Sequence, residues 1–186
     1  YQAKKQNSQD IFLEWLNPKN KKKLTWGETT SNIYKLAMTI KENINDGDRC
    51  LLVSENRPEW LISDLATMIA NGITVPAYTT YTENDYKYLI DDCEPTIIIV
   101  SNNEMHEKLK ESIKEKEFIK KVITFEKIDG VDYENKYIEF NEIIKKELLE
   151  NKKIKNLSLK RSSPACIIYT SGTGGNPKGV ILSHGG

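Results

Sequence analysis

The segment from Thr170 to Gly179 holds the residues with the clearest potential for chemistry in this sequence. Its ten residues include four glycines, three hydroxyl side chains and one lysine, and they directly follow an apolar run. Glycines let a backbone turn tightly and bring several N–H groups close to an anion, while hydroxyls and a lysine ammonium add further donors. We therefore predict a loop that binds a polyphosphate. The residues expected to contact the phosphates are Thr170, Ser171, Gly172, Thr173, Gly174, Gly175 and Lys178.

Two common phosphate-binding motifs do not fit this loop. The Walker pattern requires Gly-Lys-Ser/Thr, whereas Pro177 precedes Lys178 here and Gly179 follows it. The dinucleotide fingerprint needs a helix that opens at the loop, but residues 180–182 are Val-Ile-Leu and favour a strand. The sequence predicts a loop between two strands that relies on its own amides, hydroxyls and lysine. An ordinary surface turn is the alternative, and the Pro-Lys-Gly ending between two apolar strands argues against it.

Several other side chains could take part in chemistry, but a structural role explains them better. His184 and His106 are the two histidines, and we interpret His184 as a strand-end or supporting residue rather than a base. The carboxylate pairs Asp91–Asp92 and Glu55/Glu59 fit helix ends and caps, where solvated carboxylates are usual. Packing in the core or at its edge is expected for Trp15, Trp26 and Trp60. We predict no catalytic residue and no metal site in this segment.

Composition excludes several classes of protein. The chain has 186 residues, 27 basic and 27 acidic side chains and a mean hydropathy of −0.56. A net charge of zero gives no overall field that would steer it onto nucleic acid, so we predict no nucleic-acid partner. The apolar fraction of 38% is too high for a disordered chain. Three cysteines lie far apart in apolar runs, which favours buried free thiols and a reducing, cytoplasmic compartment.

Hydrophobic periodicity predicts alternating strands and helices. Capping signals start helices at Thr25 with Glu28, at Asn56, and at Thr82 with Asp85. Two further helices are expected over residues 103–117 and 140–149, and a basic turn over 18–23. Strands are expected over 49–54, 73–78, 96–100, 121–125, 165–169 and 180–182. Because a strand, a helix and a strand in about 30 residues form a βαβ unit, we predict an α/β fold with a mostly parallel, layered sheet and flanking helices.

Residues 169–179 resemble the phosphate-binding signature of the adenylate-forming (AMP-binding) superfamily, Thr-Ser-Gly-Thr-Thr-Gly-x-Pro-Lys-Gly. The segments at 24–28, 54–60, 75–78 and 180–184 are similar to segments of the same enzymes, so the resemblance covers essentially the whole chain. The Glu-Asn-Arg-Pro-Glu-Trp stretch at 55–60 resembles the long-chain fatty-acyl-CoA synthetase branch. One departure is Gly174, which replaces the second threonine and removes one hydroxyl from the signature.

The resemblance implies an ATP-dependent acid–thiol ligase. Such enzymes use ATP with Mg²⁺ to convert a fatty acid to acyl-AMP, and they then transfer the acyl group to CoA. Fatty acid, ATP and CoA are thus the implied partners, and the full-length enzyme is expected in the cytoplasm or at the inner face of the membrane as a peripheral protein. The resemblance implies that residues 1–186 are an incomplete N-terminal portion of the adenylation domain, inactive alone. The rest of that domain and a C-terminal lid domain with the catalytic lysine would lie outside it.

Two alternatives remain open from the sequence. A sister enzyme that activates another carboxylic or amino acid would share the loop, although the 55–60 stretch argues against it. A non-catalytic nucleotide-binding protein could also keep the loop. The oligomeric state and the length of the acyl chain are not predicted by any feature of the sequence.

Overall fold

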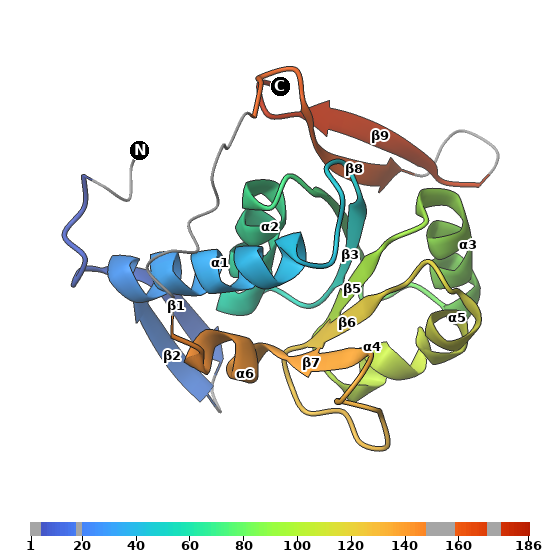
Figure 1. The fold of residues 1–186 in the computed structure, drawn as a ribbon, viewed down its shortest axis with the longest axis horizontal. Helices are drawn as coiled ribbons and strands as arrows, with labels where there is room; N and C mark the ends of the chain where they lie inside the picture. The colour runs from blue at the N-terminus through green and yellow to red at the C-terminus, as the bar shows by residue number, and fades with distance from the viewer. Residues whose placement is uncertain (1–4, 18–19, 148–158, 171–175) are drawn as a thin grey trace.

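A computed structural model describes the chain except for residues 1–4, 18–19, 148–158 and 171–175. Within the described residues, seven strands form one sheet in the order β7-β6-β5-β3-β4-β8-β9 (Figure 1). All neighbouring pairs from β7 to β8 are parallel, and β8 and β9 are antiparallel. The mostly parallel α/β sheet predicted from the sequence is confirmed. The strands of this sheet are β3 (Arg49–Val53), β4 (Ile73–Ala77), β5 (Ile97–Val100), β6 (Lys121–Thr124), β7 (Tyr137–Glu139), β8 (Pro164–Thr170) and β9 (Lys178–Ser183).

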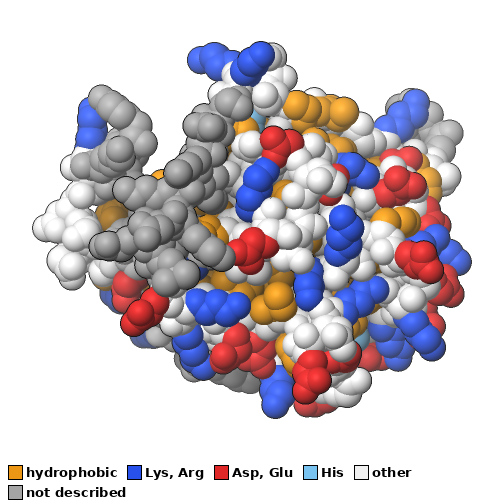
Figure 2. All heavy atoms as spheres, viewed as in Figure 1, with side chains coloured by type: hydrophobic (Ala, Val, Ile, Leu, Met, Phe, Trp, Pro, Cys, Tyr) orange, Lys and Arg blue, Asp and Glu red, His pale blue; other side chains and the backbone are white. Residues whose placement is uncertain are grey.

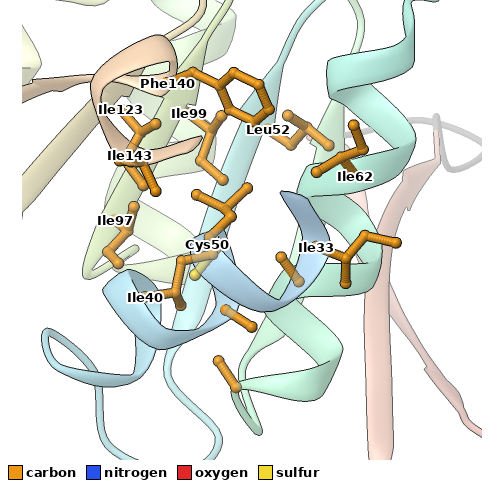
Figure 3. Close-up of a cluster of buried hydrophobic side chains, with 14 of the residues drawn as sticks. Ile33, Ile40, Cys50, Leu52, Ile62, Ile97, Ile99, Ile123, Phe140 and Ile143 are labelled. Atoms are coloured by element: carbon orange, nitrogen blue, oxygen red, sulfur yellow. The ribbon is translucent and has the colours of Figure 1, made fainter. Parts of the chain in front are cut away.

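Helices cover both faces of this sheet (Figure 1). One face carries α1 (Trp26–Lys41), α2 (Pro58–Ile69) and α6 (Phe140–Lys145), and the other carries α3 (Glu83–Cys93), α4 (Asn103–Glu107) and α5 (Lys110–Glu115). The central strands alternate between the two cores, because successive side chains of a strand point to opposite faces. Cys50 and Leu52 of β3 pack under α1 and α2, as Figure 3 shows, while Leu51 and Val53 pack under α3.

The predicted caps are confirmed at two helices and wrong at one. Thr25 and Glu28 form a capping box at α1, and Thr82 and Asp85 form another at α3. At α2 the N-cap is Arg57, which makes no side-chain capping hydrogen bond, so the predicted cap at Asn56 is wrong. Because Pro58 occupies the first helical position, where a missing N–H costs nothing, the helix begins one residue later.

The basic segment at 18–23, predicted to be a turn, largely belongs to a strand. Residues Asn20–Thr25 form β2, which pairs antiparallel with β1 (Ile11–Asn17) in a separate two-stranded sheet. The three lysines at 21–23 therefore extend along a hairpin that lies beside α1 (Figure 1). Their charge suggested a turn, but cross-strand pairing with the apolar β1 determines their conformation.

The prediction of one continuous helix over residues 103–117 is also wrong, because this segment forms two short helices. α4 ends at Glu107, and α5 begins at Lys110 after Leu109, which is completely buried. The helix predicted over 140–149 ends at Lys145 in α6, and residues 148–149 lie outside the described part of the chain.

The outer surface has mixed charge. On the face seen in Figure 2, lysines and arginines alternate with aspartates and glutamates, and no single sign dominates. None of the helices in the described part of the chain is long and apolar enough to cross a membrane.

Candidate functional site

The two ends of the predicted phosphate loop lie side by side. Thr170 is the last residue of β8 and Lys178 is the first of β9, and the two are direct partners in the antiparallel ladder. The predicted strand–loop–strand arrangement is thus confirmed at both flanks. The remaining predicted contacts, Ser171, Gly172, Thr173, Gly174 and Gly175, lie outside the described residues.

Thr170 and Lys178 form a small cationic, hydroxyl-bearing surface. Both side chains are exposed. Among the residues that the structure describes, none forms an ion pair or hydrogen bond with the Lys178 ammonium. An exposed ammonium and an exposed hydroxyl are both groups that can donate to a phosphate oxygen. The chemistry available here is therefore anion binding.

Tyr169 anchors the first flank of the loop. Its ring is buried, and its hydroxyl donates a hydrogen bond of 2.5 Å to Oδ2 of Asp92 on α3. Burial, together with this hydrogen bond and the charge of Asp92, raises the pKa of the Tyr169 phenol, so the hydroxyl stays a donor. Asp92, predicted to be a solvated helix-end carboxylate, therefore has a specific partner.

Gly179, which lies opposite Tyr169 in the ladder, allows this ring position. A Cβ atom at Gly179 would come within 2.8 Å of Cγ2 of Ile167 and 3.2 Å of Cζ of Tyr169. Because Gly179 has no side chain, it leaves space for the Tyr169 ring, whose hydroxyl donates to Asp92.

Helix α3 also contacts the second flank. The hydroxyl of Tyr88 donates a 2.9 Å hydrogen bond to the carbonyl oxygen of Pro177, directly before Lys178. Sequence reasoning missed this contact. No local pattern could have found it, because it joins residues 89 positions apart.

An open cleft of about 530 Å³ lies next to Tyr169 at the carboxyl ends of β3, β4 and β8. In open α/β sheets, ligands bind outside the carboxyl ends of the strands. The loop that follows β4 is held in place, because Tyr86 donates to the carbonyl of Tyr78 and Lys108 donates to that of Thr79. The cleft is lined by Ser54, Glu55, Asn56, Trp60, Pro76, Ala77, Tyr78, Thr79, Ile168 and Tyr169.

A nearly buried ion cluster supports the wall of this cleft. The Arg57 side chain is only 7% exposed and donates to Glu59 at 2.9 Å, to Glu126 at 2.9 Å and to Glu55 at 3.2 Å. Its guanidinium carbon lies 4.8 Å from the centre of the Trp15 ring, within cation–π range. Since Glu55 also lines the cleft, the cluster fixes the segment between β3 and α2.

Glu59 corrects the sequence interpretation of Glu55/Glu59 as solvated carboxylates. The Glu59 residue is 5% exposed, and Lys22 lies 2.7 Å from its Oε1. Burial alone would raise the pKa of Glu59, but the hydrogen bond and charge of Lys22 and the charge of Arg57 outweigh it, and the pKa falls below 4.5. Unlike an ordinary helix-end carboxylate, Glu59 is an ionised, buried partner of two cations.

The three tryptophans and His184 lie in positions that fit the packing and supporting roles predicted for them. Trp26 stacks on Phe12 with ring centres 3.7 Å apart, and Trp15 lies under Arg57, whereas Trp60 lines the cleft. His184 directly follows β9, as predicted, and the buried His106 contacts the hydroxyl of Tyr137 through Nε2 at 2.9 Å. Within the described residues, no group of three or more His, Cys, Asp and Glu side chains could hold a metal ion.

The chain is similar to known proteins over most of its length. A family model described as AMP-binding enzyme matches residues 1–186. A long-chain-fatty-acid–CoA ligase of Rattus norvegicus is 31% identical over 151 residues, which covers 78% of this chain and 20% of the relative. Long chain acyl-CoA synthetase 4 of Arabidopsis thaliana is 30% identical over 177 residues, covering 87% of this chain and 26% of the relative. The chain thus spans a fifth to about a quarter of the length of these relatives.

Solved structures share the fold. An anthranilate CoA ligase in complex with anthranoyl-AMP superposes with a TM-score of 0.79 at 20% identity, over 96% of this chain and 32% of the ligase. A luciferase-like enzyme from the mealworm Zophobas morio gives a TM-score of 0.74 at 22% identity, over 88% of this chain and 37% of that enzyme.

Proposed function

Because the chain belongs to the AMP-binding enzyme family, we propose that its full-length protein activates a long-chain fatty acid with MgATP and transfers the acyl group to CoA. The named relatives are ligases of long-chain fatty acids, which supports this choice of acid. Magnesium enters this proposal as part of the MgATP substrate. The free cysteines support a reducing compartment, and we place the protein in the cytoplasm.

The proposed reaction has two steps. A carboxylate oxygen of the fatty acid attacks the α-phosphorus of ATP, the bond from that phosphorus to the bridging oxygen breaks, and pyrophosphate leaves. The CoA thiol then releases its proton to the solvent, its sulfur attacks the acyl carbon, and the bond from that carbon to the AMP oxygen breaks, so that AMP leaves as a thioester forms. Cations and N–H donors at the β- and γ-phosphates would orient the α-phosphorus and offset charge on the departing pyrophosphate.

One observation carries this proposal: Thr170 and Lys178 are direct partners at the two ends of a glycine-rich segment. We propose that these two residues bind phosphate oxygens together with Ser171, Gly172, Thr173, Gly174 and Gly175. The sheet holds the backbones of Thr170 and Lys178 side by side before any ligand arrives, which lowers the entropy cost of binding.

We further propose that residues 1–186 are the N-terminal portion of the adenylation domain. The rest of that domain and a C-terminal lid domain would complete the enzyme. The small share of each relative's length that the chain covers supports this division.

The test is carboxylate-dependent exchange of labelled pyrophosphate into ATP by the full-length protein. Hexadecanoate should support exchange, while benzoate and phenylalanine should not. Exchange with an aryl or amino acid but not with hexadecanoate would contradict the proposed substrate, and no exchange with any acid would contradict the proposed activity.

A further inference from the structure

We propose that Tyr88 and Asp92 of α3 are positioning residues that hold both flanks of the phosphate loop and thereby set its affinity for ATP. This inference rests on the proposed function. The two residues are four positions apart and so lie on the same face of the helix. That face of α3 contacts the β8–β9 hairpin where β8 ends and β9 begins.

Each contact fixes the residue directly before a proposed phosphate contact. Tyr169, whose hydroxyl donates to Asp92, directly precedes Thr170. Pro177, whose carbonyl accepts from Tyr88, directly precedes Lys178. The hydrogen bond to the Pro177 carbonyl therefore orients the peptide unit that leads into Lys178.

Helix α3 is a suitable anchor because it is itself well fixed. Tyr86 and Ile90 are fully buried and Leu89 nearly so, and all three pack into the core beneath the sheet. The capping box of Thr82 and Asp85 fixes its first turn. A rigid helix that contacts both flanks holds them at a set separation, which is the property that a preorganised anion site needs.

The proposal separates these residues from those that touch the substrate. Tyr88 and Asp92 act through Pro177 and Tyr169, and the ammonium of Lys178 acts on the phosphates. Loss of one positioning hydrogen bond should therefore weaken ATP use without affecting the site for the fatty acid.

The test uses the full-length enzyme with Tyr88→Phe, which removes the donor to Pro177, and with Asp92→Asn, which replaces the charged acceptor of the Tyr169 hydroxyl by a weaker, neutral one. Both substitutions keep the size of the side chain. Two matched controls have the same chemistry away from the loop. Tyr133→Phe removes a hydroxyl that bonds to Thr124 and to the amide of Ile128, and Asp91→Asn removes the ion-pair partner of Lys116.

The first measurement is hydrogen–deuterium exchange without ligand. A peptide that covers residues 176–182 should exchange faster in Tyr88→Phe and Asp92→Asn than in either control, while peptides from β3 and β5 stay unchanged. Unchanged exchange at 176–182 would overturn the proposal, and this readout does not depend on enzymatic activity.

The second measurement is the KM for ATP and for hexadecanoate in the exchange reaction. For Tyr88→Phe we expect a fivefold to tenfold rise in the KM for ATP alone, on the order of one lost hydrogen bond. For Asp92→Asn we expect a smaller rise in the same KM, because the amide oxygen still accepts from the Tyr169 hydroxyl. Equal rises in both KM values, or no rise, would overturn the positioning role. If the wild-type enzyme supports no pyrophosphate exchange with any acid, the proposed function fails. Faster hydrogen–deuterium exchange at 176–182 in the variants would still support the contact between α3 and the loop.

Discussion

The ammonium of Lys22 lies 2.7 Å from the buried carboxylate of Glu59, and this ion pair joins the β1–β2 hairpin to the first turn of α2. Arg57 binds the other carboxylate oxygen of Glu59 at 2.9 Å. One carboxylate therefore connects the hairpin with the segment that lines the cleft.

Glu59→Gln should destabilise the protein by about 2 kcal/mol, because it removes a charge that two partly or wholly buried cations share. The measurement is the thermal unfolding midpoint of the full-length protein. Glu142→Gln is the control, since its ion pair with Lys145 is exposed, and it should change stability by less than about 0.5 kcal/mol. Equal effects of the two substitutions would contradict the role given to Glu59.

The same pair predicts a pH dependence. The folded-state pKa of Glu59 lies below its ordinary value of 4.5, so its stabilising effect is complete above that pH and is lost as the pH falls through the folded-state pKa. The difference in unfolding midpoint between wild type and Glu59→Gln should therefore be largest near neutral pH and shrink below pH 4.5. If the difference in unfolding midpoint grew on acidification, the pKa of Glu59 would be raised by folding and not lowered, which would contradict this prediction.

Gly179→Ala should disturb the site through Tyr169. The added Cβ would lie 2.8 Å from Ile167 and 3.2 Å from the Tyr169 ring, so the ring must move and its hydrogen bond to Asp92 weakens. We expect the KM for ATP to rise at least as much as in Asp92→Asn. The matched substitution Gly130→Ala, at an open turn with a positive φ, would cost stability without changing the KM for ATP. An unchanged KM in Gly179→Ala would contradict this account of the ring position.

The cysteines should differ in reactivity. Burial raises the pKa of both Cys50 and Cys93 to about 12, so neither forms appreciable thiolate near pH 8. Cys166 is only half-buried. Iodoacetamide treatment of the native protein followed by peptide mass spectrometry should label Cys166 before the other two. Early labelling of Cys50 would indicate that its core opens readily.

Local signals in the sequence predicted much of the fold. The buried strands are short apolar runs, and the pairs Thr25/Glu28 and Thr82/Asp85 carry the full chemistry of a capping box. The errors occur where a tertiary contact overrides a local pattern. Lys22 lies in a strand because β2 pairs with β1 and its ammonium reaches Glu59, and the helix at 103–117 is interrupted where Leu109 turns into the core.

The candidate site also has a part that the sequence predicted and a part that it did not. Residue types alone predicted that Thr170 and Lys178 belong to a phosphate-binding loop, and the structure pairs these two residues at the ends of β8 and β9. The hydrogen bonds from α3 to the two flanks of the loop could not be predicted, because the Asp92–Tyr169 and Tyr88–Pro177 contacts join residues 77 and 89 positions apart in the chain.

The most direct test of the central claim is the binding of ATP and of AMP to the full-length protein, measured by calorimetry for wild type and Lys178→Ala. If Lys178 binds the β- and γ-phosphates, the affinity for ATP should fall at least tenfold while the affinity for AMP stays unchanged. Lys145→Ala, an exposed lysine on α6, is the control and should affect neither. Unchanged ATP affinity in Lys178→Ala, or an equal loss for AMP, would contradict the claim that this loop binds the triphosphate.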